Sequence, residues 1–228
     1  RRTRLALVLT LGFASACGAP PRPINTEPRA ALAPTKDLLR VGDFEDPYVA
    51  PETAVLRGGE RIFAWAKLDK EKKGWLVEAR RLPSGAKVAD AAFTISHGEE
   101  VSQLLVRAVS DHFAIAWAEG SGRRTRIVLS HGIEGHSTVL AAPRRDILWM
   151  QIVPSSEGEL LVWAERAEDE TAELRALRVS GALEALNAPT PLASGALAWQ
   201  VIESPEGLGV LSIDRGKAEQ ELHYRTFG

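Results

Sequence analysis

The sequence predicts an all-β fold built from about four copies of one strand-rich unit. A short phrase centred on tryptophan occurs three times and returns once in altered form, as Phe63–Lys67, Ile115–Glu119, Leu161–Glu165 and Val210–Asp214. The central positions are 65, 117, 163 and 212, so successive copies lie 52, 46 and 49 residues apart. Glycines at 85, 132, 181 and 228 repeat with separate spacings of 47, 49 and 47 residues. A period of roughly 50 residues is typical of one blade of a β-propeller.

Each unit contains short apolar runs with the two-residue alternation of a β-strand. In His112–Ala118, bulky residues alternate with alanines, which suits a strand packed between two neighbouring sheets. A charged hairpin such as 69–74 follows the tryptophan run, and a second run such as 75–80 returns. An upstream run such as 147–153 and a weaker connecting run such as 137–141 complete the unit. Four antiparallel strands in each unit match a propeller blade.

Two versions of this β-propeller-like fold remain open. In the fourth unit, Ser212 replaces the tryptophan, and no fourth strand follows Gly228. A ring of four blades would therefore need a strand from elsewhere, and 37–42 is a candidate for it. The alternative is a fragment of a larger propeller with roughly six to eight blades. A β-sandwich is less suitable, because sandwiches do not repeat their sequence at a fixed period.

The composition indicates a folded domain and argues against a nucleic-acid partner. The chain has 228 residues with 45% apolar content, which is enough for a sizeable core. Its formal charge of −2 is unlike that of nucleic-acid-binding proteins, which are usually basic. Beyond the N-terminal stretch, no segment approaches the roughly 18 uncharged apolar residues of a spanning helix. With a single cysteine, Cys17, the chain cannot form an intramolecular disulfide.

The first 37 residues differ in character from the rest. Three arginines precede a short apolar stretch, Leu5–Phe13, and small residues then lead to Cys17, which is the order of a secretory signal peptide. Five prolines follow within residues 17–37, so this segment is expected to form an extended tether. We therefore predict a signal peptide at 1–16, a tether at 17–37 and a repeat domain at 38–228.

Small residues directly before a lone cysteine resemble the lipobox of bacterial lipoproteins. In that family the cysteine thiol is lipidated and becomes the new N-terminus, which implies that Cys17 is the lipidation site. Gly18, rather than an aspartate, follows the cysteine, and in that family this tends to mean export to the outer membrane. The resemblance implies an envelope protein held at a membrane by its N-terminal acyl chains.

The sequence contains no recognisable motif for an enzyme or a cofactor. It has no P-loop, nucleophile elbow, dinucleotide-binding glycine motif or H-E-x-x-H sequence. We expect no cofactor and no metal, and we leave open whether the protein is catalytic. His131, Glu134 and His136 lie together, but a metal site needs three or four converging ligands, so solvent-exposed turn residues are expected here. The repeated tryptophans are expected in the core.

Ligand contacts are expected on the loops that connect strands, because repeat scaffolds place their variable contacts there. Two loops rich in charged and polar groups are the candidates, and their residues are His97, Glu99, Glu100, Arg144, Arg145 and Asp146.

The main functional expectation is a lipid-anchored envelope protein that presents a rigid, non-catalytic surface to an unknown protein or glycan partner. One alternative is a propeller-type glycan-active enzyme, a hydrolase or a lyase. It would need two carboxylates, or an arginine cluster with a tyrosine, converging near the axis. A second alternative is a structural subunit of an envelope complex, which would expose an apolar patch.

Overall fold

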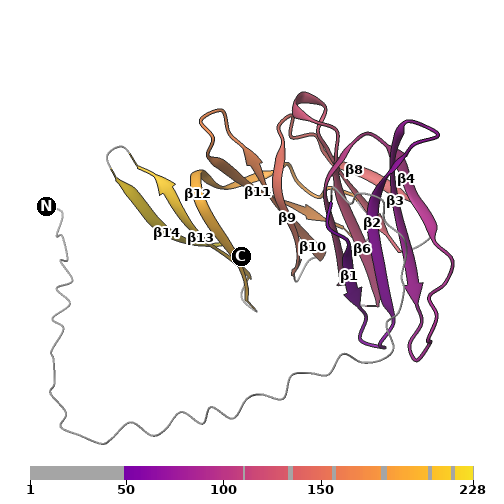
Figure 1. Cartoon of the computed structure of the whole chain (residues 1–228). Coiled ribbons are helices and arrows are strands. Elements are labelled where there is room, and N and C mark those ends of the chain that lie inside the picture. Colours follow the sequence, from indigo (N-terminus) through magenta and orange to yellow (C-terminus); the bar gives the residue numbers. More distant parts are fainter. Residues whose placement is uncertain are drawn as a thin grey trace, which may run out of the picture. The chain divides into compact units, whose positions relative to one another are not determined.

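The computed structural model describes residues 49–109, 111–132, 136–155, 158–180, 184–204, 207–216 and 219–227. The predicted signal peptide, Cys17, the tether and the strand expected at 37–42 lie outside these residues. In the described part the fold is all-β, with one short 3₁₀ turn, η1 (Gly122–Arg124) (Figure 1). Among the described residues, no helix is long and apolar enough to cross a membrane.

Three antiparallel sheets contain the strands. The first has the order β1-β2-β3-β4, the second β5-β6-β7-β8, and the third β9-β10-β11-β12-β13-β14. Their bounds are β1 (Glu52–Val55), β2 (Arg61–Asp69), β3 (Gly74–Leu82), β4 (Phe93–Gly98), β5 (Val101–Val109), β6 (His112–Glu119), β7 (Arg126–His131), β8 (Ser137–Ala141), β9 (Ile147–Ser155), β10 (Gly158–Arg166), β11 (Ala172–Val179), β12 (Thr190–Ser204), β13 (Gly207–Arg215) and β14 (Gln220–Phe227). In all three sheets, strands that are neighbours in sequence are paired.

The six-stranded sheet comprises two blades that share the long strand β12. The first half of β12 pairs with β11, from Thr190 to Ala196, and the second half pairs with β13, from Ala196 to Ser204. Gly195, with a φ of 72°, lies where the pairing changes. A left-handed backbone of this kind favours glycine. The described residues thus form four blades, and the predicted β-propeller-like fold is confirmed, with β12, β13 and β14 forming the fourth blade.

The tryptophan-containing strands β6 and β10 pack between neighbouring blades, as their alternation predicts. On β6, Phe113, Ile115 and Trp117 belong to the core shared with the first blade. The alanines at 114, 116 and 118 belong to the core shared with the third blade. These small residues allow the next sheet to approach closely, and β6 is therefore buried on both faces.

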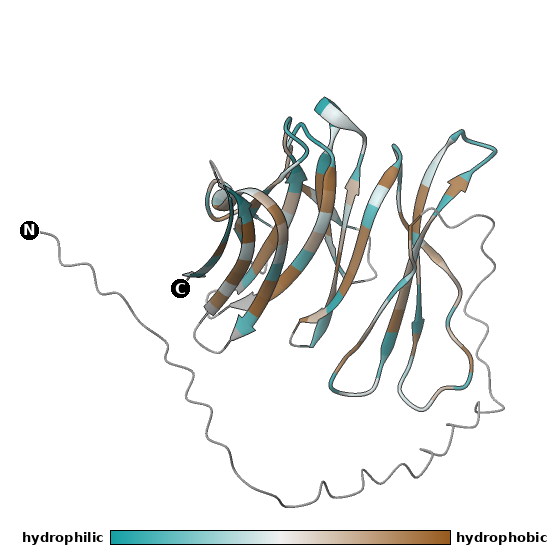
Figure 2. Ribbon diagram, turned by 60° about the vertical axis from the view of Figure 1, so that its left-hand side comes forward, coloured by the Kyte–Doolittle hydropathy of each residue, from teal (hydrophilic) through white to brown (hydrophobic). Residues whose placement is uncertain are grey.

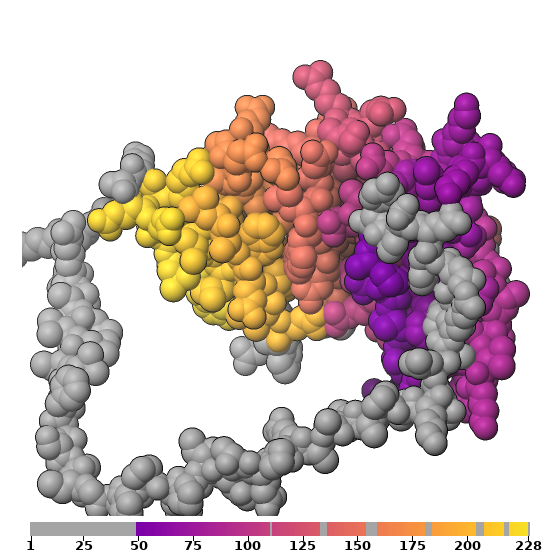
Figure 3. Space-filling view, viewed as in Figure 1, coloured from indigo at the N-terminus to yellow at the C-terminus, as the bar shows by residue number. Residues whose placement is uncertain are grey.

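Three hydrophobic cores fill the spaces between consecutive blades. The third core joins the third and fourth blades and includes Leu174 and Val210. Consecutive blades follow one another in chain order (Figure 3), and apolar residues lie along the strands while many of the connections are hydrophilic (Figure 2). On the outer face of the fourth blade, Ile213, Leu222 and Tyr224 are 37%, 69% and 61% exposed.

Candidate functional site

Every blade buries one carboxylate beside the repeated tryptophan position. Each of the four is at most 9% exposed, and they are Glu78, Glu119, Glu165 and Asp214. A buried carboxylate without a partner is strongly destabilising. A cation from the same blade therefore accompanies each one, and the pairs are Lys67–Glu78, Arg126–Glu119, Arg175–Glu165 and Arg225–Asp214.

The repeated tryptophan supports this ion pair in the first two blades. The indole Nε1 of Trp65 donates to Glu78 at 3.1 Å, and that of Trp117 donates to Glu119 at 3.0 Å. In the fourth blade the hydroxyl of Ser212 replaces the indole and accepts a hydrogen bond from Arg225 at 3.1 Å. The Trp-to-Ser change therefore preserves a polar contact at this position.

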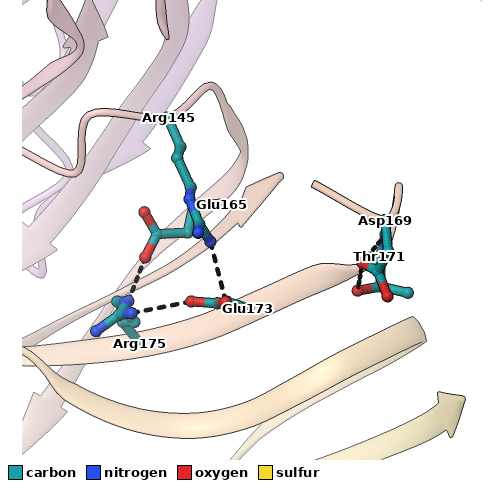
Figure 4. A network of polar contacts seen from close by, with 6 residues as sticks. All are labelled: Arg145, Glu165, Asp169, Thr171, Glu173 and Arg175. Carbon is teal, nitrogen blue, oxygen red and sulfur yellow. Dashed lines mark hydrogen bonds and ion pairs between the residues drawn. The ribbon is translucent and has the colours of Figure 1, made fainter. Parts of the chain in front are cut away.

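The third blade extends its ion pair into a network of four charged side chains (Figure 4). Arg175, on β11, binds Glu165 on β10 through Nε, and binds Glu173 through Nη2 at 2.9 Å. Arg145, from the connection between β8 and β9, binds the other oxygen of Glu173 at 2.9 Å. Glu165 and Glu173 thus share the guanidinium of Arg175, and the guanidinium of Arg145 also binds Glu173.

An open pocket of about 540 Å³ lies against this network. Glu165, Arg175 and Arg145 form its charged wall, and Trp163 lines it beside them. The remaining wall consists of small and apolar residues, namely Leu140, Ala141, Ala142, Pro143 and Pro189. Its size is within the ~300–1,000 Å³ of small-molecule sites, and the mixture of an apolar wall with a few polar groups is also typical of them.

The two carboxylates of the network have pKa values displaced in opposite directions. Burial raises the pKa of Glu165 above its ordinary value, although Arg175 beside it acts in the other direction. The hydrogen bond from Arg145 lowers the pKa of Glu173, and the hydrogen bond from Arg175 adds to this effect against partial burial. Opposed shifts in a neighbouring pair are the pattern that separates a proton donor from an ionised partner.

A second polar group links β5, β9 and β12, which are the first strands of the second, third and fourth blades and are called their inner strands. Arg107 on β5 binds both oxygens of Glu203 on β12, at 2.6 and 2.7 Å. Gln151 on β9 donates to the same carboxylate at 2.7 Å. Because the side chains of this group satisfy one another, we assign it a structural role.

The structure places one of the predicted ligand-binding residues, Arg145, in the pocket wall. Its neighbour Arg144 is exposed with a φ of 64°, and Asp146 accepts a hydrogen bond from the amide of Gly122 at 2.8 Å. Asp146 therefore fixes the connection between β6 and β7.

The other predicted loop lies on the opposite flank of the same connection. Glu99 lies 3.7 Å from Arg124, and the carbonyl of Glu100 accepts from the amide of Gly120 at 2.8 Å. His97 lies 3.7 Å from Asp69. In the described contacts these three residues bind neighbouring hairpins, and none of them lines the pocket.

Sequence reasoning missed Glu165, Glu173 and Arg175. The sequence did contain a signal for Glu165. Positions 119, 165 and 214 each carry an acid two residues after the repeated Trp or Ser, inside an otherwise apolar strand. An acid at a position buried in each repeat has to be paired or functional. The roles of Glu173 and Arg175 depend on strand register, which places Glu165 opposite Glu173 and Trp163 opposite Arg175.

The histidine-rich segment is arranged differently from the exposed turn that was expected. His131 is the last residue of β7 and only partly exposed, and it lies near His112 and Glu159. His136 is exposed, and Glu134 lies outside the described residues. Among the described side chains, the group of His112, His131 and Glu159 is suited to hold a metal ion.

Comparisons with known proteins found similarity in structure. An α-L-arabinofuranosidase from Lactobacillus brevis matches with 12% identity and a TM-score of 0.46, over 78% of this chain and 67% of that one. A family 117 glycoside hydrolase from the marine bacterium Zobellia galactanivorans matches with 10% identity and a TM-score of 0.48, over 82% and 70%. An endo-arabinase from Bacteroides thetaiotaomicron matches with 15% identity and a TM-score of 0.36, over 75% and 74%. No protein-family model and no curated protein matches the sequence.

These comparisons correct the main functional expectation. The sequence favoured a non-catalytic binding or scaffold surface, whereas the similar solved structures are glycoside hydrolases, and the glycan-active alternative agrees better with them. They give no support to the lipoprotein, signal-peptide and outer-membrane expectations. At these identities the likeness concerns the fold alone, so the case for an activity must come from the pocket.

Proposed function

We propose that this protein is a glycan-active hydrolase, with Glu165 and Glu173 as its catalytic carboxylates. The observation that supports this most is the guanidinium of Arg175, which lines the pocket together with Glu165 and also holds Glu173, a residue outside the pocket lining. The pKa values of these two carboxylates are displaced in opposite directions. Glycoside hydrolysis ordinarily uses such a pair, one protonated and one ionised. This is the glycan-active alternative, with the carboxylates in the third blade instead of at the axis.

The roles follow from the environments of the two groups. Glu165, the buried group with the raised pKa, is the proton donor to the glycosidic oxygen. Glu173, kept ionised by Arg145 and Arg175, attacks the anomeric carbon as the bond to the leaving group breaks. Water, deprotonated by Glu165, then displaces Glu173 and releases the sugar. Two carboxylates on one guanidinium lie close together, which favours this retaining route over the wider spacing of roughly 6.5–9.5 Å in inverting enzymes.

The pocket walls suit a small sugar unit. Sugar rings present apolar C–H faces as well as hydroxyl groups, and the pocket combines proline, alanine and leucine surfaces with charged donors and acceptors. Arg145 and Arg175 supply several N–H donors in fixed planes, which suits hydroxyl oxygens. The substrate class is therefore a short glycan or a terminal glycosyl unit.

The test is hydrolysis of a panel of aryl furanosides and pyranosides by the purified protein, with E165Q and E173Q as variants. We expect turnover of at least one substrate and a loss of about 10²–10⁴-fold in each variant. The matched control is E119Q, which removes the equivalent buried carboxylate of the second blade, paired with Arg126 at 2.9 Å but away from the pocket lining. Equal losses in E119Q and E165Q, with all proteins folded by circular dichroism, would contradict the proposal.

We further propose that the protein acts at the cell envelope, anchored through Cys17. The support is the sequence alone, namely an apolar stretch followed by small residues and the single cysteine. A C17S variant of the full-length precursor should move from the membrane to the soluble fraction, as measured by fractionation and immunoblotting. Retention of C17S in the membrane fraction would contradict lipidation at this residue.

A further inference from the structure

Three side chains from two neighbouring blades meet at the end of the strands far from the pocket. His112 is the first residue of β6, His131 is the last residue of β7, and Glu159 is near the start of β10. Glu159 and the pocket residue Glu165 are six residues apart on β10, which corresponds to about 20 Å along a strand. The group is therefore separate from the proposed catalytic pair.

The distances within this group fit ligands that share one ion better than they fit hydrogen bonds. Nε2 of His112 lies 3.7 Å from Oε1 of Glu159, and Nε2 of His131 lies 3.6 Å from the same oxygen. Both distances exceed the usual hydrogen-bond range of about 2.7–3.2 Å. Ligand atoms bound to one zinc ion at about 2.0–2.2 Å in a tetrahedron are roughly 3.3–3.5 Å apart. The three ligand atoms all lie within 4.8 Å of one another, and they would draw closer together to share one ion.

Three polar atoms of the group also lack a hydrogen-bond partner. Nε2 of His112, Nε2 of His131 and Oε2 of Glu159 are buried and have no hydrogen-bond partner. The side chain of Glu159 is 6% exposed. The nearby Arg107 binds both oxygens of Glu203 instead. A buried carboxylate without a hydrogen bond is costly, and a bound cation would satisfy all three atoms.

We propose that His112, His131 and Glu159 form a zinc site that links the second and third blades. Two imidazoles and one carboxylate are a donor set that zinc prefers, whereas calcium and magnesium favour oxygen ligands alone. Three protein ligands leave the fourth position of a tetrahedral ion open to water or another ligand. The site does not rest on the proposed hydrolase activity, and its test measures binding alone.

The test is isothermal titration of zinc into the full chain after dialysis against a chelator, repeated with calcium. We expect one equivalent of zinc, no comparable binding of calcium, and a rise in the melting temperature with zinc. Cobalt in place of zinc should give the intense visible absorption of a four-coordinate ion. Binding of less than a tenth of an equivalent of zinc would overturn the proposal.

The variants are H112A, H131A and E159Q, with H136A as the matched control. His136 is exposed, and it is five residues from His131 in the chain but outside the group. H112A removes a partly exposed ligand and is the variant least damaging to the fold, whereas H131A and E159Q alter more buried positions. We expect at least a 10-fold weaker affinity in the folded ligand variants and no change in H136A. Unchanged affinity in a folded H112A, or lost affinity in H136A, would overturn the site.

Discussion

Arg107 and Glu203 form a bidentate ion pair across 96 residues of sequence, with N–O distances of 2.6 and 2.7 Å. They join the inner strand of the second blade to the inner strand of the fourth. Gln151, on the inner strand of the third blade, donates to the same carboxylate at 2.7 Å. One carboxylate therefore fixes three inner strands, whereas the hydrophobic cores join the blades only in consecutive pairs.

We predict that E203Q lowers the free energy of unfolding by about 1 kcal/mol at neutral pH, because the pair is bidentate but partly exposed. Urea denaturation of the variant beside R107A and the double variant would measure the coupling between the two side chains. Additive losses in the double variant would show that the ion pair contributes nothing of its own.

The contribution of Glu203 should depend on pH in a defined direction. The hydrogen bond from Arg107 lowers the pKa of Glu203, although partial burial opposes it. The unfolded chain therefore takes up the proton first as the pH falls, so the stabilisation is present above the ordinary carboxyl pKa and is lost as the pH falls through the lowered one. The difference between wild type and E203Q should shrink from pH 7 towards pH 3. A difference that is constant over this range would contradict the assignment.

We predict that W117F is more destabilising than W163F by about 1 kcal/mol, the net value of one hydrogen bond. The two indoles are equally buried, at 0% and 1% exposure, and occupy equivalent strands. However, Nε1 of Trp117 donates to Glu119 at 3.0 Å, whereas that of Trp163 has no acceptor among the described residues. Thermal or urea unfolding of both variants measures the difference, and a greater loss in W163F would contradict it.

Gly195 should resist substitution more than a glycine of a surface turn. Nothing lies within 4 Å of a Cβ built at Gly195, but its φ is 72°, so G195A should cost about 1–2 kcal/mol from the backbone alone. Gly58 also has open space around it and no left-handed φ, and G58A is the control with little expected change. Equal free energies of unfolding for G195A and G58A would mean that β12, the strand shared by two blades, relaxes at Gly195.

The rate of hydrolysis should peak at acidic pH. The acid limb reports protonation of Glu173, whose pKa is lowered chiefly by the hydrogen bond from Arg145. The alkaline limb reports loss of the proton from Glu165, whose pKa burial raises. R145A should therefore move the acid limb to higher pH and leave the alkaline limb nearly in place. Movement of the alkaline limb alone would reverse the roles of the two carboxylates.

The sequence predicted the repeat and its strands well, because buried strands have a local signature. The run expected at 137–141 coincides with β8, and the tryptophan run of 112–118 lies within β6. Gly85 and Gly132, singled out by their spacing, have φ values of 74° and 63°, which explains why glycine recurs there. The first strand of the first blade, Glu52–Val55, was missed because it has only four residues and no clear alternation.

The sites could be predicted much less well, because each one depends on strand register or on contacts between blades. Glu173 is held in the network by Arg175 on its own strand and by Arg145, which lies 28 residues earlier in the connection between β8 and β9. Likewise, His131 meets Glu159 across a blade boundary, whereas the sequence predicted a solvent-exposed turn at His131. Contacts of this kind follow from the twist and spacing of sheets, which no short motif specifies.

The covalent intermediate expected on Glu173 is the most direct test of the proposed hydrolase. An activated 2-fluoro glycoside of the preferred sugar, incubated with the protein, should slow the second step and leave one glycosyl group attached. Intact mass and peptide mapping should then place it on Glu173 in wild type and find no label in E173Q. Turnover of the parent substrate with no label, or with the label on another carboxylate, would contradict the assignment of Glu173 as the nucleophile.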